Sequence, residues 1–138
     1  MEEFIWRKLK TITAPQPEGS VWTPALDYLL AKRIYRLKAK GTWTVGEAKK
    51  ECGPDGIDTP EKRTQDLICN GSPFGSLIAK VGGSTADRTG FIFAVGRHCV
   101  FQIAEDAKTG PLFLGANDLA GILPIVTKQI EIEIEIAL

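Results

Sequence analysis

The sequence predicts an all-β fold, an antiparallel β-sandwich of jelly-roll type, and three observations lead to it. Short stretches with alternating apolar and polar residues recur along the chain, which is typical of strands with one buried face. Glycine, proline and asparagine separate these stretches. No segment is long enough to supply the helices of βαβ units. About eight or nine strands at such spacing indicate a sandwich or jelly roll.

Length and charge narrow the classes of protein further. At 138 residues the chain matches a single domain, residues 1–138, that buries about two thirds of its unfolded surface. Seventeen basic and seventeen acidic residues cancel, so we expect neither nucleic acid nor a membrane as partner. The first residues lack the pattern of a secretory signal peptide. We expect a soluble, cytoplasmic protein, with export by another route left open.

Cysteine and histidine content bears on metal and catalytic sites. Cys52, Cys69 and Cys99 form no CxxC pair, and His98 is the single histidine, which argues against structural zinc and for free thiols. Because His98 and Cys99 are adjacent, a strand directs them to opposite faces and they cannot act together. We expect no enzyme activity.

The sequence predicts the first element more clearly than the second. Phe4 to Ile12 (FIWRKLKTI) alternates in part and predicts an edge-type first strand, ended by prolines that cannot donate to a ladder. Val21 to Leu30 is ambiguous, because Thr23-Pro24 is an acceptable helix start. The neighbouring segments favour extended structure there.

The clearest alternation runs from Arg33 to Val45. The apolar set of alternate residues predicts a core-facing side, and the basic set predicts a solvent-facing side. The core-facing residues are Tyr35, Leu37 and Ala39, and the basic ones are Arg36, Lys38 and Lys40. Gln129 to Ile136 (QIEIEIEI) predicts a final strand with one acidic face. The basic residues are candidate cross-strand partners of Glu131, Glu133 and Glu135.

The middle of the chain predicts loops and short strands. Gly46 to Gln65 shows neither the periodicity of a helix nor that of a strand and predicts a long surface loop. Loops of this length are often functional. Asp66 to Val81 predicts two short strands around the Asn70 to Pro73 turn. Further strands are predicted at Phe91 to Gly96 and His98 to Ala104, followed by a turn at Glu105 to Gly110.

A candidate binding corner follows the next strand. Pro111 to Leu114 predicts a short strand broken by Gly115, after which Asn117 and Asp118 place two side-chain oxygens at a sheet edge. The same two residues also suit a turn that caps the strand through local hydrogen bonds. Both interpretations remain open from sequence.

Five short motifs occur along the middle of the chain. They are GTWTVG (41–46), CGPDG (52–56), QDLICNGSPFGSLIAKVG (65–82), TGFIFAVG (89–96) and LFLGAND (112–118). In their order and spacing they resemble the motifs of the PA-IL-like galactophilic lectins and related small jelly-roll carbohydrate-binding modules. The resemblance covers roughly Lys38 to Asp118.

The resemblance implies a calcium ion in a terminal loop that binds two sugar hydroxyls. Asp118 matches the first calcium carboxylate of the family, and Val45 is the nearest match to its backbone-carbonyl ligand. Where the family has two asparagines, this chain has Ile125 and Val126, which offer no side-chain oxygen. We therefore predict a degenerate calcium loop and no cofactor, with Asp118 and Val45 as the candidate ligands if calcium is retained. Gln65 matches a sugar-contacting residue of the family, and Lys62 falls near another.

The sequence thus predicts a non-enzymatic binding module that resembles a galactose-binding lectin. Trp43 is a candidate stacking platform for a sugar, although a tryptophan in an alternating strand is commonly a core residue. The candidate ligand-binding residues are Gln65, Asp118, Asn117, Trp43, Lys62 and Asp55. The alternative is an interaction or assembly module, with a protein partner or a second copy bound at the apolar stretch Ile122 to Val126.

Overall fold

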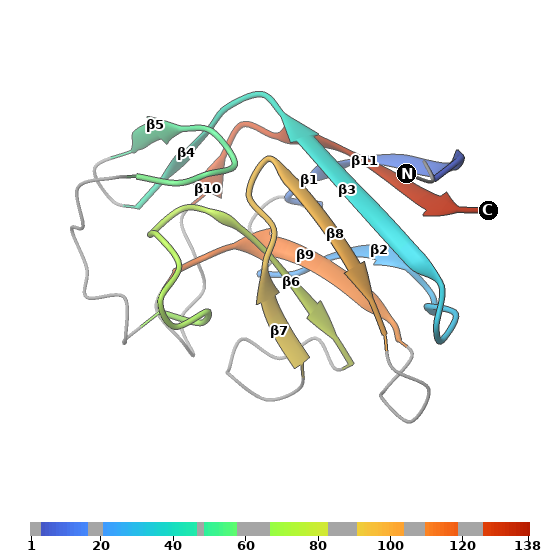
Figure 1. Ribbon diagram of the computed structural model, residues 1–138. Coiled ribbons are helices and arrows are strands. Elements are labelled where there is room, and N and C mark those ends of the chain that lie inside the picture. Colours follow the sequence, from blue (N-terminus) through green and yellow to red (C-terminus); the bar gives the residue numbers. More distant parts are fainter. Residues whose placement is uncertain are drawn as a thin grey trace.

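The computed structural model describes residues 4–16, 21–46, 49–57, 67–82, 91–103, 110–118 and 126–138. These residues form eleven strands in three antiparallel sheets, and the fold is a β-sandwich (Figure 1). The strands are β1 (Trp6–Ala14), β2 (Thr23–Leu26), β3 (Ile34–Lys40), β4 (Trp43–Val45), β5 (Lys50–Cys52), β6 (Leu77–Val81), β7 (Phe91–Ala94), β8 (His98–Gln102), β9 (Leu112–Ala116), β10 (Val126–Thr127) and β11 (Ile130–Ala137). The described part of the chain contains no helix that could span a membrane.

Two four-stranded sheets make the sandwich. The upper sheet in Figure 1 has the order β1-β11-β3-β8, and the lower one has the order β2-β9-β6-β7. Without the short strands β4, β5 and β10, the eight remaining strands pair first with last, second with seventh, third with sixth and fourth with fifth. This pairing is the jelly-roll arrangement. The three short strands form a third sheet at one end, in the order β10-β4-β5.

The predicted alternation of the last strand organises the upper sheet. β11 lies between β1 and β3 and pairs with both. Its isoleucines Ile130, Ile132, Ile134 and Ile136 are all buried in the main core. From β3, Tyr35 and Leu37 join them, as predicted, while Ala39 is partly buried against the same core.

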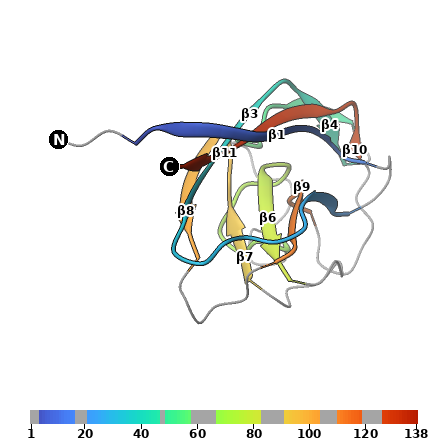
Figure 2. The same cartoon turned by 90° about the vertical axis from the view of Figure 1, so that its right-hand side faces the viewer.

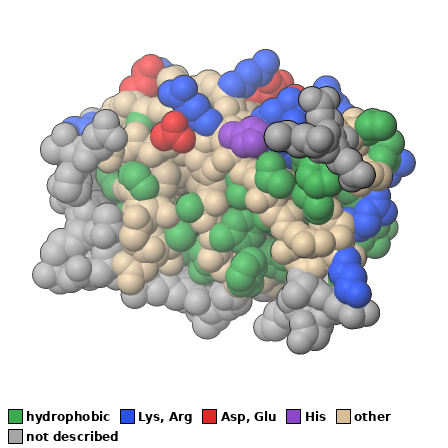
Figure 3. Space-filling view, viewed as in Figure 1, with side chains coloured by type: hydrophobic (Ala, Val, Ile, Leu, Met, Phe, Trp, Pro, Cys, Tyr) green, Lys and Arg blue, Asp and Glu red, His purple; other side chains and the backbone are tan. Residues whose placement is uncertain are grey.

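The predicted cross-strand charge pairs lie on the outer face of the upper sheet. Glu131, Glu133 and Glu135 oppose Lys40, Lys38 and Arg36 in the register of β11 and β3. The Arg36 guanidinium donates to both carboxylate oxygens of Glu135, with Nε–Oε1 and Nη2–Oε2 distances of 2.8 and 2.9 Å. In addition, Arg36 Cζ lies 4.3 Å from the centroid of the Trp6 ring. Charged side chains gather along the upper part of the face in Figure 3, above a more hydrophobic region.

A second, smaller core covers the outer face of the lower sheet. All five residues of β6 are buried, because its two faces contact different cores. Val21, Trp22, Ile68 and Ile78 form the smaller core. Lys80 is completely buried there, and its Nζ lies 5.7 Å from the Trp22 ring centroid.

Val21 to Leu30 contains the strand β2, which agrees with the extended structure favoured by the neighbouring segments. Three other local predictions need correction. The predicted loop after Gly46 contains β5, because Lys50–Cys52 pairs with β4. Of the two strands predicted in Asp66 to Val81, the described residues 67–81 form only β6. Finally, Gly115 continues β9 and does not end it, since it pairs with Ile78 and leaves room for the Val21 carbonyl oxygen.

Other predicted segments fall partly outside the described residues. These are the remainder of the long loop, the turn after β8 and most of Ile122 to Val126, of which Val126 begins β10 and is buried.

The Arg36–Glu135 pair predicts a pH-dependent contribution to stability. Hydrogen bonds from Arg36, reinforced by Lys38, lower the pKa of Glu135 from its ordinary value of 4.5, while burial opposes the shift. A lowered folded-state pKa stabilises the fold above the unfolded-state value, and this contribution is lost as pH falls through the folded-state pKa. We expect Glu135→Gln to reduce the free energy of unfolding by about 1–3 kcal/mol at neutral pH, and by less below pH 4.5. Urea denaturation of both proteins at neutral and acidic pH measures the difference.

The matched control is Glu131→Gln. Its carboxylate lies 3.1 Å from Lys40 Nζ, but Lys40 is largely exposed and Glu131 nearly half exposed, so the pair contributes about 0–1 kcal/mol. An equal loss of stability in both variants at neutral pH would contradict the central role of the Arg36 pair.

Candidate ligand-binding site

The predicted Asn117 corner is a buried structural clamp. Asn117 is 0% exposed, and its Oδ1 accepts a 2.8 Å hydrogen bond from the Cys69 amide. Its Nδ2 donates to the carbonyls of Cys69, Ser72 and Pro73 at 3.0–3.3 Å. The side chain therefore holds the 69–73 turn in place. These hydrogen bonds favour the capping interpretation of Asn117, and its role in ligand binding stays a prediction from the sequence.

Two further predicted residues are also buried. Trp43 is 1% exposed and donates its indole N–H to the Gly75 carbonyl at 2.9 Å, so it lies in the core. Asp118 is 6% exposed, and its backbone carbonyl accepts a hydrogen bond from the Ile68 amide. The second candidate calcium ligand, Val45, is buried in β4 between Val126 and Lys50.

The remaining predicted residues lie elsewhere. Asp55 is exposed, and its carboxylate binds both the side chain and the backbone amide of Arg97 at 3.0 Å. It thereby ties the loop after β5 to the β7–β8 turn. Gln65 and Lys62 lie outside the described residues. Of the four predicted positions that the structure describes, three are buried and only Asp55 is exposed.

A different site lies at the open edge of the sandwich, between β1 and the β2–β3 connection. Here the structure has a cleft of about 340 Å³, a volume within the range of small-ligand sites. We call it the β1–β2 cleft. The residues that line it are Arg7, Leu9, Lys10, Leu26, Asp27, Tyr28, Leu30, Tyr35 and Ile136.

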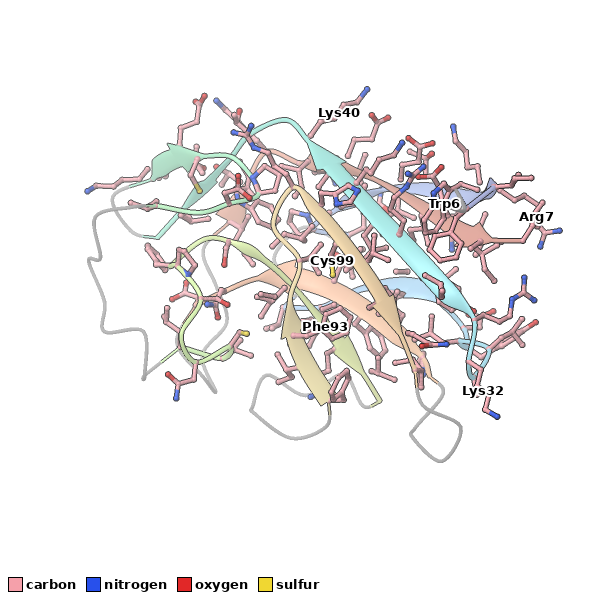
Figure 4. All side chains as sticks on the ribbon, in the orientation of Figure 1. Trp6, Arg7, Lys32, Lys40, Phe93 and Cys99 are labelled. Carbon is pink, nitrogen blue, oxygen red and sulfur yellow. The ribbon has the colours of Figure 1, made fainter. Side chains whose placement is uncertain are left out.

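The cleft has an apolar floor and a charged mouth. Tyr35 and Ile136 are each 2% exposed and belong to the main core. Arg7, Lys10 and Asp27, in contrast, are exposed. Figure 4 shows Arg7 at the end of the molecule where β11 ends, and Figure 2 shows β1 extending toward that end along the edge of the sandwich.

A bulge in β1 brings the two cations to the same side of the sheet. Arg7 pairs with Ile136 and Lys10 with Ile134, and the register shifts between Lys8 and Lys10. In a regular strand, residues three apart point to opposite faces. Because a bulge adds one residue, it re-aims the side chains that follow. Arg7 and Lys10 therefore both lie opposite core-facing isoleucines of β11.

The opposite wall is held in a fixed conformation by several contacts. The Leu30 amide donates to the Tyr35 hydroxyl at 2.7 Å, and the Lys32 amide donates to the Ile103 carbonyl at 2.8 Å. Gly110 packs directly beneath this wall, since a side chain there would place its Cβ 2.6 Å from Tyr28 Cα. Asp27 and Tyr28 thus project from a pinned backbone.

The charged groups of the cleft have no internal partners among the described residues. No hydrogen bond or ion pair engages the side chains of Arg7, Lys10 or Asp27 within that part of the chain, in contrast to Arg36 and Lys40 of the same sheet. Tyr28 is 65% exposed. These four side chains are available to contact a bound molecule.

Sequence reasoning did not find this cleft. The FIWRKLKTI segment alternates only in part, and that irregularity marks the bulge. It does not reveal that the Asp27–Tyr28 segment lies opposite β1. That proximity depends on the jelly-roll connection between the two sheets.

Two of the cysteines, Cys52 and Cys99, lie in surroundings that disfavour a nucleophilic thiolate. Burial raises the pKa of the Cys52 and Cys99 thiols, which disfavours the reactive thiolate. His98 is exposed while Cys99 is half-buried against the main core, consistent with opposite faces of β8.

No protein-family model matches the chain, and no curated protein matches it. The resemblance to the galactophilic lectins remains a prediction from the motifs.

The structural role of Asn117 is testable by substitution. Asn117→Ala leaves the Cys69 amide and the facing carbonyls without their partner in a buried site, so we expect unfolding to require about 3 kcal/mol less free energy. The control is Asn70→Ala in the same turn, because Asn70 is exposed; its effect should stay within about 0.5 kcal/mol. Urea denaturation measures both, and similar values for the two variants would contradict the clamp.

Proposed function

We propose that the protein is a non-enzymatic carbohydrate-binding module and that the β1–β2 cleft is its sugar site. The observation that carries the proposal is the position of Tyr28, an exposed aromatic ring beside three charged groups that have no partners within the described chain. Sugar rings present an apolar face to aromatic side chains and a rim of hydroxyls to polar ones. The cleft offers groups for both.

The polar groups of the cleft include both hydrogen-bond donors and a hydrogen-bond acceptor. Arg7 and Lys10 donate to hydroxyl oxygens, while Asp27 accepts from hydroxyl protons. Leu9, Leu26 and Leu30 between them offer apolar contact. Sites that recognise small ligands specifically usually combine an apolar lining with a small number of placed polar groups.

Preorganisation also supports a binding role. The backbone that carries Asp27 and Tyr28 is fixed by Gly110 and by the Tyr35 hydroxyl, and β1 belongs to a four-stranded sheet. A site that is already ordered spends little conformational entropy on binding. The proposed site uses Asp27 as its one carboxylate and requires no metal ion.

Removal of the aromatic ring tests the proposal. We expect Tyr28→Ala to weaken binding of the best sugar from a glycan panel by about tenfold or more, because the stacking surface is lost. Isothermal titration calorimetry measures the affinity, and addition of a calcium chelator should leave it unchanged.

The matched control is Phe91→Ala, which removes an aromatic ring that is 55% exposed on β7, away from the cleft. Equal losses in both variants, or no binding to any glycan by the unmodified protein, would refute the proposal.

A second candidate function is self-association through an apolar patch beside the chain ends. Phe4, Ile5 and Leu138 are 54%, 69% and 68% exposed, and the Leu138 amide donates to the Ile5 carbonyl at 2.9 Å. Adjacent exposed apolar side chains of this size are typical of interaction surfaces. The patch is separate from the predicted surface Ile122 to Val126, of which residues 122–125 lie outside the described part of the chain.

Sedimentation velocity tests the second candidate. If the patch joins two copies, the unmodified protein should sediment as a dimer and Ile5→Asp as a monomer, because a charge cannot be buried there without a partner. Val100→Asp on β8, also at an exposed apolar position, should remain a dimer. A monomeric unmodified protein at all concentrations would exclude this function.

A further inference from the structure

The charge of the β1–β2 cleft is unbalanced. Two cations, Arg7 and Lys10, face one carboxylate, Asp27. Within the described residues no salt bridge reduces this excess of positive charge. Elsewhere on the same sheet, by contrast, the basic side chains Arg36, Lys38 and Lys40 each have an acidic partner. The cleft is therefore a place where one additional negative charge would be stabilised.

The geometry of β1 also favours a negatively charged group in the cleft. Inner-face positions opposite Ile134 and Ile136 would ordinarily hold apolar residues, yet the strand has Lys10 and Arg7 there. The bulge between Lys8 and Lys10 is what places both on this face. An arginine fork and a lysine on one side of a cleft suit an oxyanion, because the guanidinium donates two parallel hydrogen bonds to a carboxylate.

We propose that the ligand of the β1–β2 cleft is an acidic saccharide, a sugar whose ring bears a carboxylate, with the carboxylate held by Arg7 and Lys10. This inference rests on the proposed function. Asp27 then accepts from the ring hydroxyls and Tyr28 contacts the apolar face of the ring. A single net positive charge matches a monoanionic carboxylate better than a dianionic phosphate, which Asp27 would repel more strongly.

Matched ligand pairs separate this inference from the proposed function. Galacturonate and glucuronate differ from galactose and glucose by a carboxylate in place of a hydroxymethyl group. Calorimetric titration of the protein at low salt should give at least one of the two uronates an affinity about tenfold or more above that of its neutral hexose. The advantage should shrink as sodium chloride is added, because the charged groups are exposed and screened.

Variants of β1 complete the test. Arg7→Gln should abolish the preference for the uronate, because it should lower the affinity for the uronate by a larger factor than the affinity for the neutral hexose, whose hydroxyls the glutamine amide can still reach as a donor. Lys8→Gln is the control, because Lys8 lies on the other face, 3.5 Å from Glu133; it should retain the preference. Both positions are exposed, so both variants should fold, and thermal unfolding verifies this.

The outcomes are distinct. If neither uronates nor neutral sugars bind the unmodified protein, the proposed function fails and the inference fails with it. If neutral hexoses bind as tightly as uronates, or Arg7→Gln keeps the preference, the sugar site stands and the acidic ligand is wrong. A hexose 6-phosphate that binds more tightly than the uronate would also overturn the carboxylate assignment.

Discussion

The structure depends on the burial of one face of β11. Its isoleucines pack into the core from the middle of the upper sheet, and the pairing of β11 with both β1 and β3 follows from that position. A shift of one residue would move every isoleucine to the solvent face and every glutamate into the core. The same constraint therefore sets the register of both neighbouring strands, and with it the partners of Arg36, Lys38 and Lys40.

The cleft is a consequence of this arrangement. β1 and β2 are the outer strands of the two sheets on the same side of the sandwich. The main core extends to Tyr35 and Ile136 but does not fill the space between these edges. Where core packing ends, the inner face of β1 can carry charged residues without a desolvation penalty. The cleft thus forms because the main core ends before the edge strands β1 and β2.

Sequence reasoning predicted most of the fold and little of the candidate site. The strict alternation of Gln129 to Ile136 and of Arg33 to Val45 was sufficient to predict the inward and outward faces of β11 and β3, as well as their charge pairs. The buried roles of Asn117 and Trp43 were left as alternatives, because polar and aromatic residues beside a turn have the same local pattern whether they face solvent or core. The proximity of Tyr28 to Arg7 depends on tertiary structure, and no local pattern encodes it.

The bulge in β1 also affects how the chain meets other chains. An outer strand of nine residues offers a row of backbone groups to which a strand from another molecule can add, and extended sheets and aggregates grow in this way. An inserted residue interrupts the regular spacing of those groups, and lysine or arginine beside it repels a second copy aligned in the same manner. The irregularity that turns Lys10 toward the cleft thereby also protects an exposed sheet edge against intermolecular strand pairing.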